Sequence, residues 1–358
     1  MKEKTENGEK ILIINTGGTI SMVRLENNGG KSSLKPSKSW DEAIQNYQFL
    51  KKLNVDYAQT SKIIDSSDMN CELWMEIAEI IEKNYSRYKG FVILHGTDTM
   101  SYTASALSFM FKNLNKTVIL TGAQRPIQEM RSDGLQNLLT SIEIIEKQEK
   151  SWDKEEGLPV VPEVCIFFRD HLFRGNRSRK LDSSNYFGFS SPNYLPLGQA
   201  GSRINIYKDR IMKNPLKEFY VDYKINPNVL MIDLFPSFNP EILKRIFCKN
   251  NENNELKGLI LRTYGSGNTP QSREFLDVLK YIADSGIIVL NITQCTVGSV
   301  EPGLYEANEG VTEIGAVNGY DMTPEAAITK FMCLLGKYSD KEKIKKKLEE
   351  NIAGELTK

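Results

Sequence analysis

The feature of this sequence that most limits its fold is a regular alternation of short apolar runs with segments of helical period. The apolar runs cover residues 11–15, 91–94, 118–121 and 164–168, and the helical segments cover residues 72–85, 100–111 and about 132–147. Strands that are apolar on both faces and alternate with amphipathic helices are typical of a parallel sheet covered on both sides. The sequence therefore predicts an α/β fold.

The alternation stops and then resumes, which predicts two domains. Residues 198–228 are polar and contain two prolines, and the strand and helix patterns return at residues 229–234, 258–263, 271–284, 287–293 and 324–335. A chain of 358 residues is also long for a single hydrophobic core. We expect a larger N-terminal, mostly parallel α/β domain over residues 1–197, a linker over residues 198–228 and a smaller C-terminal α/β domain over residues 229–358. Residues 148–163 are expected to form an exposed insertion within the first domain.

The charge balance argues against several classes of protein. Lys+Arg and Asp+Glu both number 46, so the formal net charge is zero and there is no long-range attraction to nucleic acids or anionic membranes. No apolar run approaches the roughly 18 residues that cross a bilayer. Residues 1–10 are polar and charged, unlike a signal peptide. We expect a cytoplasmic protein with no nucleic-acid partner and no membrane partner.

The cysteines indicate neither disulfides nor a metal. They are odd in number and widely spaced, and no Cys-x-x-Cys occurs among Cys71, Cys165, Cys248, Cys295 and Cys333. The sequence therefore predicts reduced cysteines, no metal site and no cofactor.

Two polar motifs stand where an open α/β sheet binds ligands, just past the C-terminal ends of strands. The sequence TGGTI occupies residues 16–20 and HGTDTM occupies residues 95–100, each directly after a predicted strand. In both, glycine permits a sharp turn and a close approach of substrate to the backbone, and hydroxyl groups follow. A single Gly-Gly-Thr is also explained by a tight turn whose hydroxyl bonds the backbone. Only the two motifs together indicate a site.

Together these motifs resemble the two signature motifs of the bacterial-type asparaginases. The resemblance continues in order along nearly the whole chain, through DSSDMN at 65–70, TGAQRP at 121–126, SDG at 132–134 with Asn137 and Leu138, RGNRSRK at 174–180, SPN at 191–193, YGSGN at 264–268 and NITQC at 291–295. The stretches DSSDM and RGNR look closest to the cytoplasmic type I branch. The resemblance implies the asparaginase-like fold and the hydrolysis of L-asparagine to L-aspartate and ammonia.

The resemblance also implies roles for the matching residues. Thr19 would be the nucleophile that forms an acyl-enzyme. A second catalytic group would consist of Thr97, Asp98 and Lys180. The substrate would be bound by Ser66, Ser67, Asp68, Thr97, Asp98 and Asn268.

An oligomer and a regulatory pocket are implied as well. In the family Asn268 would reach the site of a neighbouring subunit, so a homodimer or homotetramer is expected. The residues that match an asparagine-sensing allosteric pocket of the type I branch are Arg262, Thr293, Gln294 and Cys295.

The chemistry of these residue types supports the same roles. Amide hydrolysis needs an activated nucleophile, donors for the developing oxyanion and a proton for the departing ammonia. A threonine hydroxyl is a weak nucleophile unless its proton is removed, and Lys180, neutral through burial or relayed through Asp98 and Thr97, could remove it. Asp68 supplies the carboxylate that the α-amino group of asparagine requires.

Several residues have structural interpretations beside the functional ones. No Gly-x-Ser-x-Gly elbow accompanies the two histidines, so a Ser-His-Asp hydrolase is not signalled. His95 is predicted to be a structural residue at a strand end, and Cys295 to be buried and unreactive. For Asp133 with Asn137, capping and bracing of a helix stays open beside a role in the site.

Two other functions compete with asparagine hydrolysis. An amidotransferase subunit that releases ammonia from glutamine shares the scaffold but carries an extra N-terminal domain, whereas only ten residues precede the first strand here. A ligand-binding sensor on the same scaffold would not need a nucleophile, so the presence together of Thr19, Thr97, Asp98 and Lys180 argues against it.

One departure from the family pattern concerns the loop after TGGTI. Many asparaginases carry a tyrosine there that helps to activate the nucleophile, but residues 21–40 contain none and the next is Tyr47. The sequence NNGGKSS at 27–33 favours a flexible turn. We therefore predict a mobile lid over Thr19, with proton removal depending on Lys180.

Overall fold

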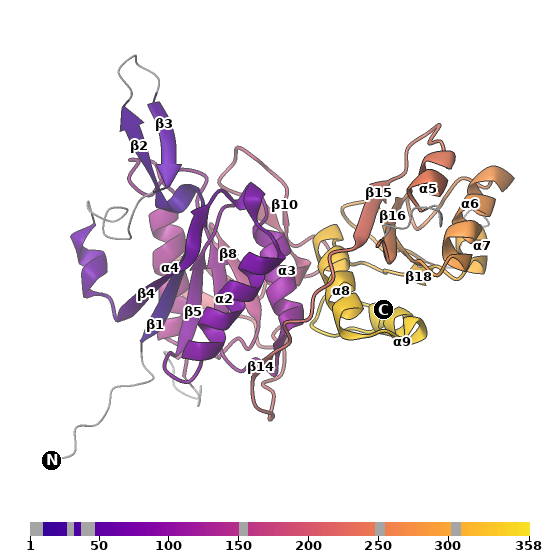
Figure 1. Cartoon of the computed structure of the whole chain (residues 1–358). Helices are drawn as coiled ribbons and strands as arrows, with labels where there is room; N and C mark the ends of the chain where they lie inside the picture. The colour runs from indigo at the N-terminus through magenta and orange to yellow at the C-terminus, as the bar shows by residue number, and fades with distance from the viewer. Residues whose placement is uncertain (1–9, 27–31, 37–46, 150–156, 248–254, 302–308) are drawn as a thin grey trace. The chain divides into compact units, whose positions relative to one another are not determined.

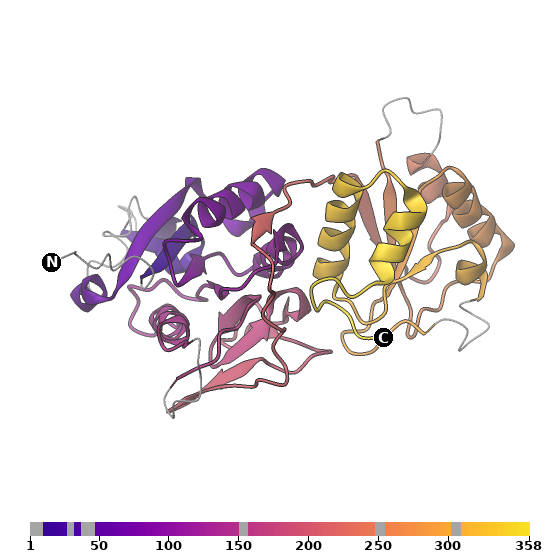
Figure 2. The same ribbon diagram turned by 90° about the horizontal axis from the view of Figure 1, so that it is seen from below.

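The structure, a computed structural model, describes residues 10–26, 32–36, 47–149, 157–247, 255–301 and 309–358. The chain divides into two units, Met1–Tyr223 and Lys224–Lys358 (Figure 1). In each unit, helices cover both faces of a sheet whose central strands are parallel (Figure 2). The predicted α/β class is confirmed.

The first unit is built on an eight-stranded sheet of order β13-β12-β9-β8-β7-β5-β1-β4. Its strands are β1 (Ile11–Gly17), β4 (Val55–Ile64), β5 (Gly90–Leu94), β7 (Val118–Thr121), β8 (Val164–Phe168), β9 (His171–Arg174), β12 (Gly198–Ala200) and β13 (Ile204–Ile206). The strands from β4 to β8 in this order are parallel, and β9, β12 and β13 continue the sheet antiparallel. Because β4 and β5 pair on opposite sides of β1, the strand order reverses there, which is where an open α/β sheet binds ligands.

Three helices cover the two faces of this sheet: α2 (Cys71–Asn84), α3 (Met100–Met110) and α4 (Gly134–Glu146). Helix α4 packs Leu138 and Ile142 into one core cluster with Ile13 and Val92 of the strands. Helices α2 and α3 lie on the opposite face (Figure 2). Successive strand residues point to opposite faces, so β5, which is buried throughout, is apolar on both.

Short strands and 3-10 turns complete the first unit. The strands are β2 (Met22–Glu26), β3 (Ser32–Pro36), β6 (Phe111–Lys112), β10 (Arg179–Lys180), β11 (Phe189–Ser190) and β14 (Tyr220–Val221), and the turns are Thr19–Ser21, Gln48–Lys52, Ser66–Asp68 and Gly175–Arg177. Strands β2 and β3 form an antiparallel hairpin in the stretch predicted to be a lid. Of the flexible turn predicted at residues 27–33, residues 27–31 lie outside the described residues, and Ser32 and Ser33 belong to β3.

The predicted linker over residues 198–228 and the domain bounds at residues 197 and 229 are wrong, because the first unit extends to Tyr223 and the second begins at Lys224. Strands β12 and β13 extend the large sheet through pairing with β9, and β14 pairs with β6 of the first unit. These strands have only two or three residues each and are partly exposed. They therefore need no apolar run, and the periodicity of the sequence does not reveal them.

The predicted exposed insertion over residues 148–163 is wrong at both of its ends. Residues 150–156 lie outside the described residues, but Gln148 and Glu163 are buried. Glu163 can be buried because Arg174 lies 2.5 Å away and balances its charge. A prediction that a charged residue is exposed therefore fails when an oppositely charged residue elsewhere in the chain pairs with it.

Strand β4 is not predicted by sequence periodicity. Only Thr60 is buried in its ten residues. Among the described strands it pairs with β1 alone. As an edge strand it carries polar side chains that protect a sheet edge, and no apolar run marks it.

The second unit has a four-stranded parallel sheet of order β15-β16-β17-β18. Its elements are β15 (Val229–Asp233), α5 (Glu241–Ile246), β16 (Gly258–Thr263), α6 (Arg273–Asp284), β17 (Ile288–Thr293), α7 (Glu309–Glu313), β18 (Val317–Asn318), α8 (Pro324–Lys337) and α9 (Lys341–Glu349). Phe331 of α8 and Ile344 of α9 pack on one face of the sheet, and Leu243 of α5 and Phe275 of α6 pack on the other (Figure 2). Two cores therefore sandwich this sheet.

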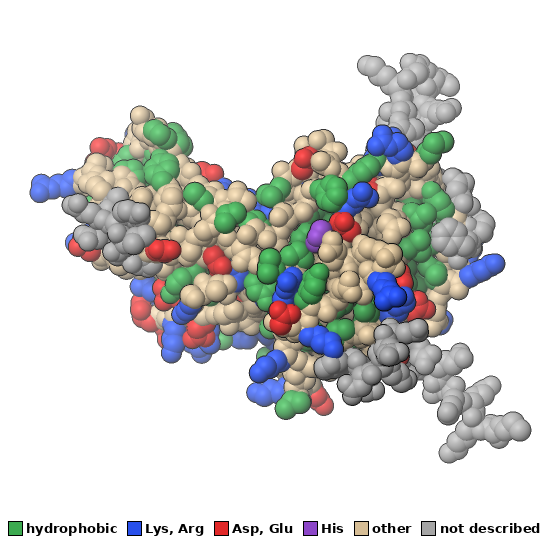
Figure 3. All heavy atoms as spheres, turned by 180° about the vertical axis from the view of Figure 1, so that it is seen from behind, with side chains coloured by type: hydrophobic (Ala, Val, Ile, Leu, Met, Phe, Trp, Pro, Cys, Tyr) green, Lys and Arg blue, Asp and Glu red, His purple; other side chains and the backbone are tan. Residues whose placement is uncertain are grey.

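The charged side chains are mixed in sign. On the face shown in Figure 3, lysine and arginine alternate with aspartate and glutamate, and no large patch carries one sign. That face offers no electrostatic footprint for a nucleic acid. In the described part of the chain, no helix is both long and apolar enough to cross a membrane. Nor does any group of three or more histidine, cysteine or acidic side chains there form a metal site.

Candidate functional site

Three turns meet at the carboxyl ends of the neighbouring strands β1, β4 and β5. Gly18 of the first turn lies against Gly96 of the third, so that a Cβ atom on Gly18 would come within 2.4 Å of the Gly96 Cα atom. Gly96 in turn lies against Ser66 of the second turn, whose Oγ atom would be 2.5 Å from a Cβ atom on Gly96. Glycine at these two positions lets the turns pack at backbone distance, and a side chain there would push them apart.

Thr19 begins a 3-10 turn directly after these contacts. Gly17 and Gly18 precede it with φ angles of 117° and 79°, in a region that other residues rarely adopt. Thr19 is half-buried, and none of the described residues hydrogen-bonds to its hydroxyl group. The hydroxyl therefore lies at the edge of the sheet without a hydrogen-bond partner among the described residues.

A lysine, a threonine and an aspartate form a hydrogen-bonded cluster after β5. Lys180 Nζ donates to Thr97 Oγ1 at 2.7 Å and to Asp98 Oδ1 at 2.6 Å. The Lys180 side chain is 16% exposed, whereas that of Asp98 is 65% exposed. Thr97 and Thr19 each directly follow one of the two touching glycines. The structure thus brings the four predicted catalytic residues to adjoining segments.

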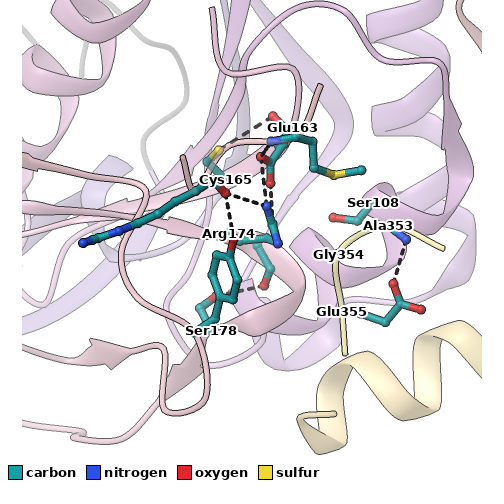
Figure 4. A network of polar contacts seen from close by, with 12 residues as sticks. Ser108, Glu163, Cys165, Arg174, Ser178, Ala353, Gly354 and Glu355 are labelled. Atoms are coloured by element: carbon teal, nitrogen blue, oxygen red, sulfur yellow. Dashed lines mark hydrogen bonds and ion pairs between the residues drawn. The ribbon is translucent and has the colours of Figure 1, made fainter. Parts of the chain in front are cut away.

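The segment that carries Lys180 begins at a buried ion pair (Figure 4). Arg174 at the end of β9 donates from Nε to Glu163 Oε2 at 2.5 Å, and their side chains are only 7% and 2% exposed. A 3-10 turn follows, and β10 then places Lys180 opposite Phe189 of β11. Breaking a buried ion pair leaves an unpaired charge at a cost of about 3–5 kcal/mol. The pair therefore fixes the start of the segment that positions Lys180.

The turn after β4 holds the residues predicted to bind substrate. Ser66 is buried, whereas Ser67 and Asp68 are exposed. The Ser67 hydroxyl donates to Asp65 Oδ1 at 2.9 Å. Within the described part of the chain, nothing hydrogen-bonds to the Ser66 hydroxyl or to the Asp68 carboxylate. A hydroxyl donor and an anion therefore lie at this turn without a partner among the described residues.

His95 is a buried structural residue whose two ring nitrogens are both bonded. Nδ1 lies 2.7 Å from the Gly96 carbonyl oxygen, and Nε2 lies 2.8 Å from Thr103 Oγ1. The Trp74 indole N–H donates to the same Thr103 oxygen at 3.0 Å. The Thr103 hydroxyl therefore donates to Nε2, and the imidazole proton sits on Nδ1. Burial lowers the pKa of His95 to about 4, so the ring stays neutral.

Asp133 braces the turn after β7. Its carboxylate accepts hydrogen bonds from the Gln124 N–H at 3.0 Å and from the Arg125 N–H at 3.2 Å, and Asn137 donates to the Gly122 carbonyl oxygen at 3.0 Å. The Asp133 side chain does not cap helix α4, which follows it, whereas the Ser132 hydroxyl oxygen accepts from the Gly134 N–H at 3.0 Å. Of the two interpretations left open, capping by Asp133 is wrong, and the contacts of Asp133 and Asn137 brace the turn after β7.

The residues predicted to sense asparagine lie in the second unit, at the carboxyl ends of β16 and β17. Thr293 Oγ1 donates to the Gly265 carbonyl oxygen at 2.6 Å, and Gln294 Nε2 donates to the Arg262 carbonyl oxygen at 2.7 Å. The Arg262 guanidinium pairs with Asp233 at 2.8 Å. Its Nε atom is buried and lacks a partner among the described residues. These residues form one polar cluster.

Two more predicted residues flank this cluster. The Asn268 N–H closes a turn on the Tyr264 carbonyl oxygen at 2.8 Å, and Asn268 Oδ1 is buried with no partner in the described ranges. Cys295 is exposed, so the prediction that it is buried is wrong. It lies two residues beyond the end of β17, outside the sheet.

Comparison with known proteins matches both units. The family model described as "Asparaginase, N-terminal" covers residues 10–212, and "Glutaminase/Asparaginase C-terminal domain" covers residues 228–348. The chain belongs to the asparaginase family. It is 38% identical over 352 residues to "L-asparaginase 1" of Escherichia coli, with 98% of each chain covered.

Solved structures and a further relative agree with this membership. The crystal structure of L-asparaginase I from Vibrio cholerae has a TM-score of 0.85 and 36% identity, over 98% of this chain and 99% of that chain. A glutamyl-tRNA(Gln) amidotransferase polypeptide of Sulfolobus acidocaldarius is 31% identical, over 98% of this chain and 76% of that protein. The predicted resemblance and the hydrolase class are confirmed.

For this asparaginase-family chain, His95 predicts a loss of stability in acid. The folded protein keeps the ring neutral to about pH 4, whereas the ring in the unfolded chain takes up a proton below its ordinary value of 6.5. The unfolded state thus binds more protons between these values, and the free energy of unfolding falls by about 3 kcal/mol as the pH decreases through them. NMR titration, with His171→Gln to assign the rings, should give His95 a midpoint near 4. A midpoint at the ordinary histidine value would contradict the buried neutral ring.

The family motifs alone miss several residues that hold this site together. No family motif contains Glu163, Trp74 or Thr103, yet these residues anchor the Lys180 segment and His95. One signal was available, because Glu163 is a charge directly before the apolar run of β8. Trp74 and Thr103 could not be recognised from the sequence, since tryptophan and threonine are both common on helices.

Proposed function

We propose that the chain hydrolyses L-asparagine to L-aspartate and ammonia with Thr19 as the nucleophile. The Thr19 oxygen attacks the carbon of the side-chain amide, the C–N bond breaks, and the nitrogen gains a proton and leaves as ammonia. The ester formed on Thr19 is the acyl-enzyme. Water then attacks its carbonyl carbon, aspartate leaves, and Thr19 regains its proton.

The observation that carries this proposal is the cluster of Lys180, Thr97 and Asp98 beside the free hydroxyl of Thr19. A lysine hydrogen-bonded to a hydroxyl and to a carboxylate can relay a proton between them. Such a relay can accept the proton of the nucleophile and later deliver one to the leaving nitrogen, as general acid–base catalysis requires.

Substrate capture follows from the turn after β4. The Asp68 carboxylate would bind the α-ammonium group, and the Ser66 hydroxyl would donate to the α-carboxylate, because neither has another partner among the described residues. Ser67 would join them once its hydroxyl turns away from Asp65. A substrate fixed by both head groups presents its side-chain amide in one orientation.

Ammonia release from L-asparagine and from L-glutamine, measured over a wide range of concentrations, tests the proposal. We expect ammonia from asparagine. Release from glutamine alone would favour the amidotransferase alternative, which one relative bears in its name. Release from neither would favour a sensor.

The quaternary and cellular setting belong to the same proposal. Asn268 has a buried oxygen without a partner in the described residues, and it would complete the site of a neighbouring subunit in a homodimer or homotetramer. A cytoplasmic location is part of the proposal, because the described cysteines Cys71, Cys165, Cys295 and Cys333 form no disulfide with one another.

We also propose that the polar cluster around Arg262 binds asparagine as an effector. The buried Arg262 Nε lacks a partner among the described residues and can donate to a carboxylate. Velocity against asparagine should then be sigmoidal, because an effector that binds one state of an oligomer better shifts the equilibrium toward it. Arg262→Met should make the curve hyperbolic. A hyperbolic curve for the unaltered enzyme at every concentration would remove the regulatory role and leave the catalytic proposal intact.

A further inference from the structure

Thr99 stands at the N-terminus of α3 but does not cap it. Threonine at the residue before a helix normally accepts a hydrogen bond from an N–H of the first turn, which contributes about 1 kcal/mol to stability. No such bond forms at Thr99. Thr323, the corresponding residue of α8, accepts from the Ala326 N–H at 3.1 Å. The hydroxyl of Thr99 is therefore directed elsewhere, at a cost to its own helix.

The Thr99 hydroxyl instead donates to the carbonyl oxygen of Ser66 at 2.6 Å. This bond crosses 33 residues of sequence and joins the turn after β5 to the turn after β4. Gly96 packs against the Ser66 side chain from the same turn after β5. Two contacts, one polar and one steric, thus fix the position of Ser66 relative to the motif HGTDTM.

The two joined turns hold opposite ends of the proposed substrate. Ser66 and Asp68 would bind the α-carboxylate and the α-ammonium group, whereas Thr97 and Asp98 belong to the cluster that acts on the amide. Thr99 is two residues from Thr97 and is hydrogen-bonded to Ser66. It therefore sets the distance between the turn that would bind the head groups and the cluster that would act on the amide. With its head groups bound in the same way, glutamine would place its amide carbon about 1 Å beyond the position that the amide carbon of asparagine occupies. A misplacement of about 1 Å can reduce the rate about 10²-fold.

We propose that Thr99 is a positioning residue that makes the site select the side chain of asparagine over that of glutamine, which is longer by one methylene. This inference rests on the proposed asparagine hydrolysis and goes beyond it by assigning a residue to substrate length. Thr99 acts through the Ser66 turn and does not touch the substrate. In a pocket that fits one of two substrates, a difference of one methylene changes kcat/KM by about 10–200-fold. The Thr99 bond would help to maintain a preference for asparagine in that range.

The test compares kcat/KM for asparagine and for glutamine in Thr99→Val, Thr99→Ala and Thr99→Ser. Valine keeps the shape of threonine without the donor, alanine offers a second variant should valine not fold, and serine keeps the hydroxyl. In the valine or alanine variant we expect kcat/KM for asparagine to fall about 10–100-fold and the asparagine-to-glutamine ratio to narrow about tenfold or more. The inhibition constant for L-aspartate should rise, because the product uses the same head-group turn. Serine should restore values to within about threefold of the unaltered enzyme.

Thr323→Val is the matched control, since it removes a threonine hydroxyl from a helix N-terminus in the second unit. It should lower stability and leave the substrate ratio unchanged. An unchanged ratio in Thr99→Val and Thr99→Ala, or a serine variant that behaves like valine, overturns the role of Thr99. If the unaltered enzyme releases no ammonia from asparagine, the proposed function itself has failed, so the two failures are distinguishable.

Discussion

Thr19→Ala is expected to leave the fold intact and to reduce asparagine turnover by several orders of magnitude, on the order of 10⁴-fold or more. The hydroxyl of Thr19 forms no hydrogen bond to any residue that the structure describes, so its removal leaves no buried partner unsatisfied. Its backbone turn is set by the two preceding glycines, which the substitution does not touch. Stopped assays of ammonia release, together with thermal unfolding, would measure both effects.

Thr16→Val is a suitable control for this substitution. Thr16 lies in the same motif, but its hydroxyl donates to the Leu94 carbonyl oxygen at 2.9 Å and is buried. Its loss should cost about 1 kcal/mol of stability and little of the rate. Added hydroxylamine should trap an acyl-enzyme as the hydroxamate with the unaltered protein and not with Thr19→Ala. Activity near that of the unaltered protein in a folded Thr19→Ala would rule out Thr19 as the nucleophile.

The parts of the fold that sequence predicts best are those where both faces of an element are buried. Strand β5 reads as an unbroken apolar run because helices cover it on both sides. Strand β4 and the hairpin of β12 and β13 lie at sheet edges, where polar residues are tolerated, and no run marks them. An apolar pattern arises where other elements pack on a strand and bury its side chains. A strand that is not covered in this way therefore cannot be predicted from the pattern.

The candidate site divides in the same way. The two glycine turns could be placed from residues alone, because ligand sites of α/β sheets lie at strand ends. Lys180 could not, since 83 residues separate it from Thr97 and only the family resemblance joined them. The Thr99 bond to Ser66 gave no signal at all, because a hydroxyl and a backbone carbonyl group occur throughout any chain. Contacts between distant segments need the fold before they can be named.

Lys180→Met is expected to abolish asparagine turnover, with a loss on the order of 10³-fold or more. The substitution removes the donor to Thr97 Oγ1 and Asp98 Oδ1 but keeps an unbranched side chain of similar length. Asp98 is 65% exposed, so it stays hydrated when its partner is lost, and little stability should be lost with it. Rates and thermal unfolding measured on the same preparation separate the two effects.

Tyr47→Phe is the companion variant, because Tyr47 is the first tyrosine after the motif TGGTI. Its phenol donates to the Ile127 carbonyl oxygen at 2.9 Å, and the Ile127 N–H in turn donates to the Ile20 carbonyl oxygen at 3.4 Å. The phenol thus supports the backbone beside Thr19 through Ile127 and Ile20. We expect a stability loss of about 1 kcal/mol and turnover close to that of the unaltered enzyme. Loss of turnover in Tyr47→Phe with unchanged stability would show that a phenol activates Thr19, and Lys180 would then act only on the leaving group.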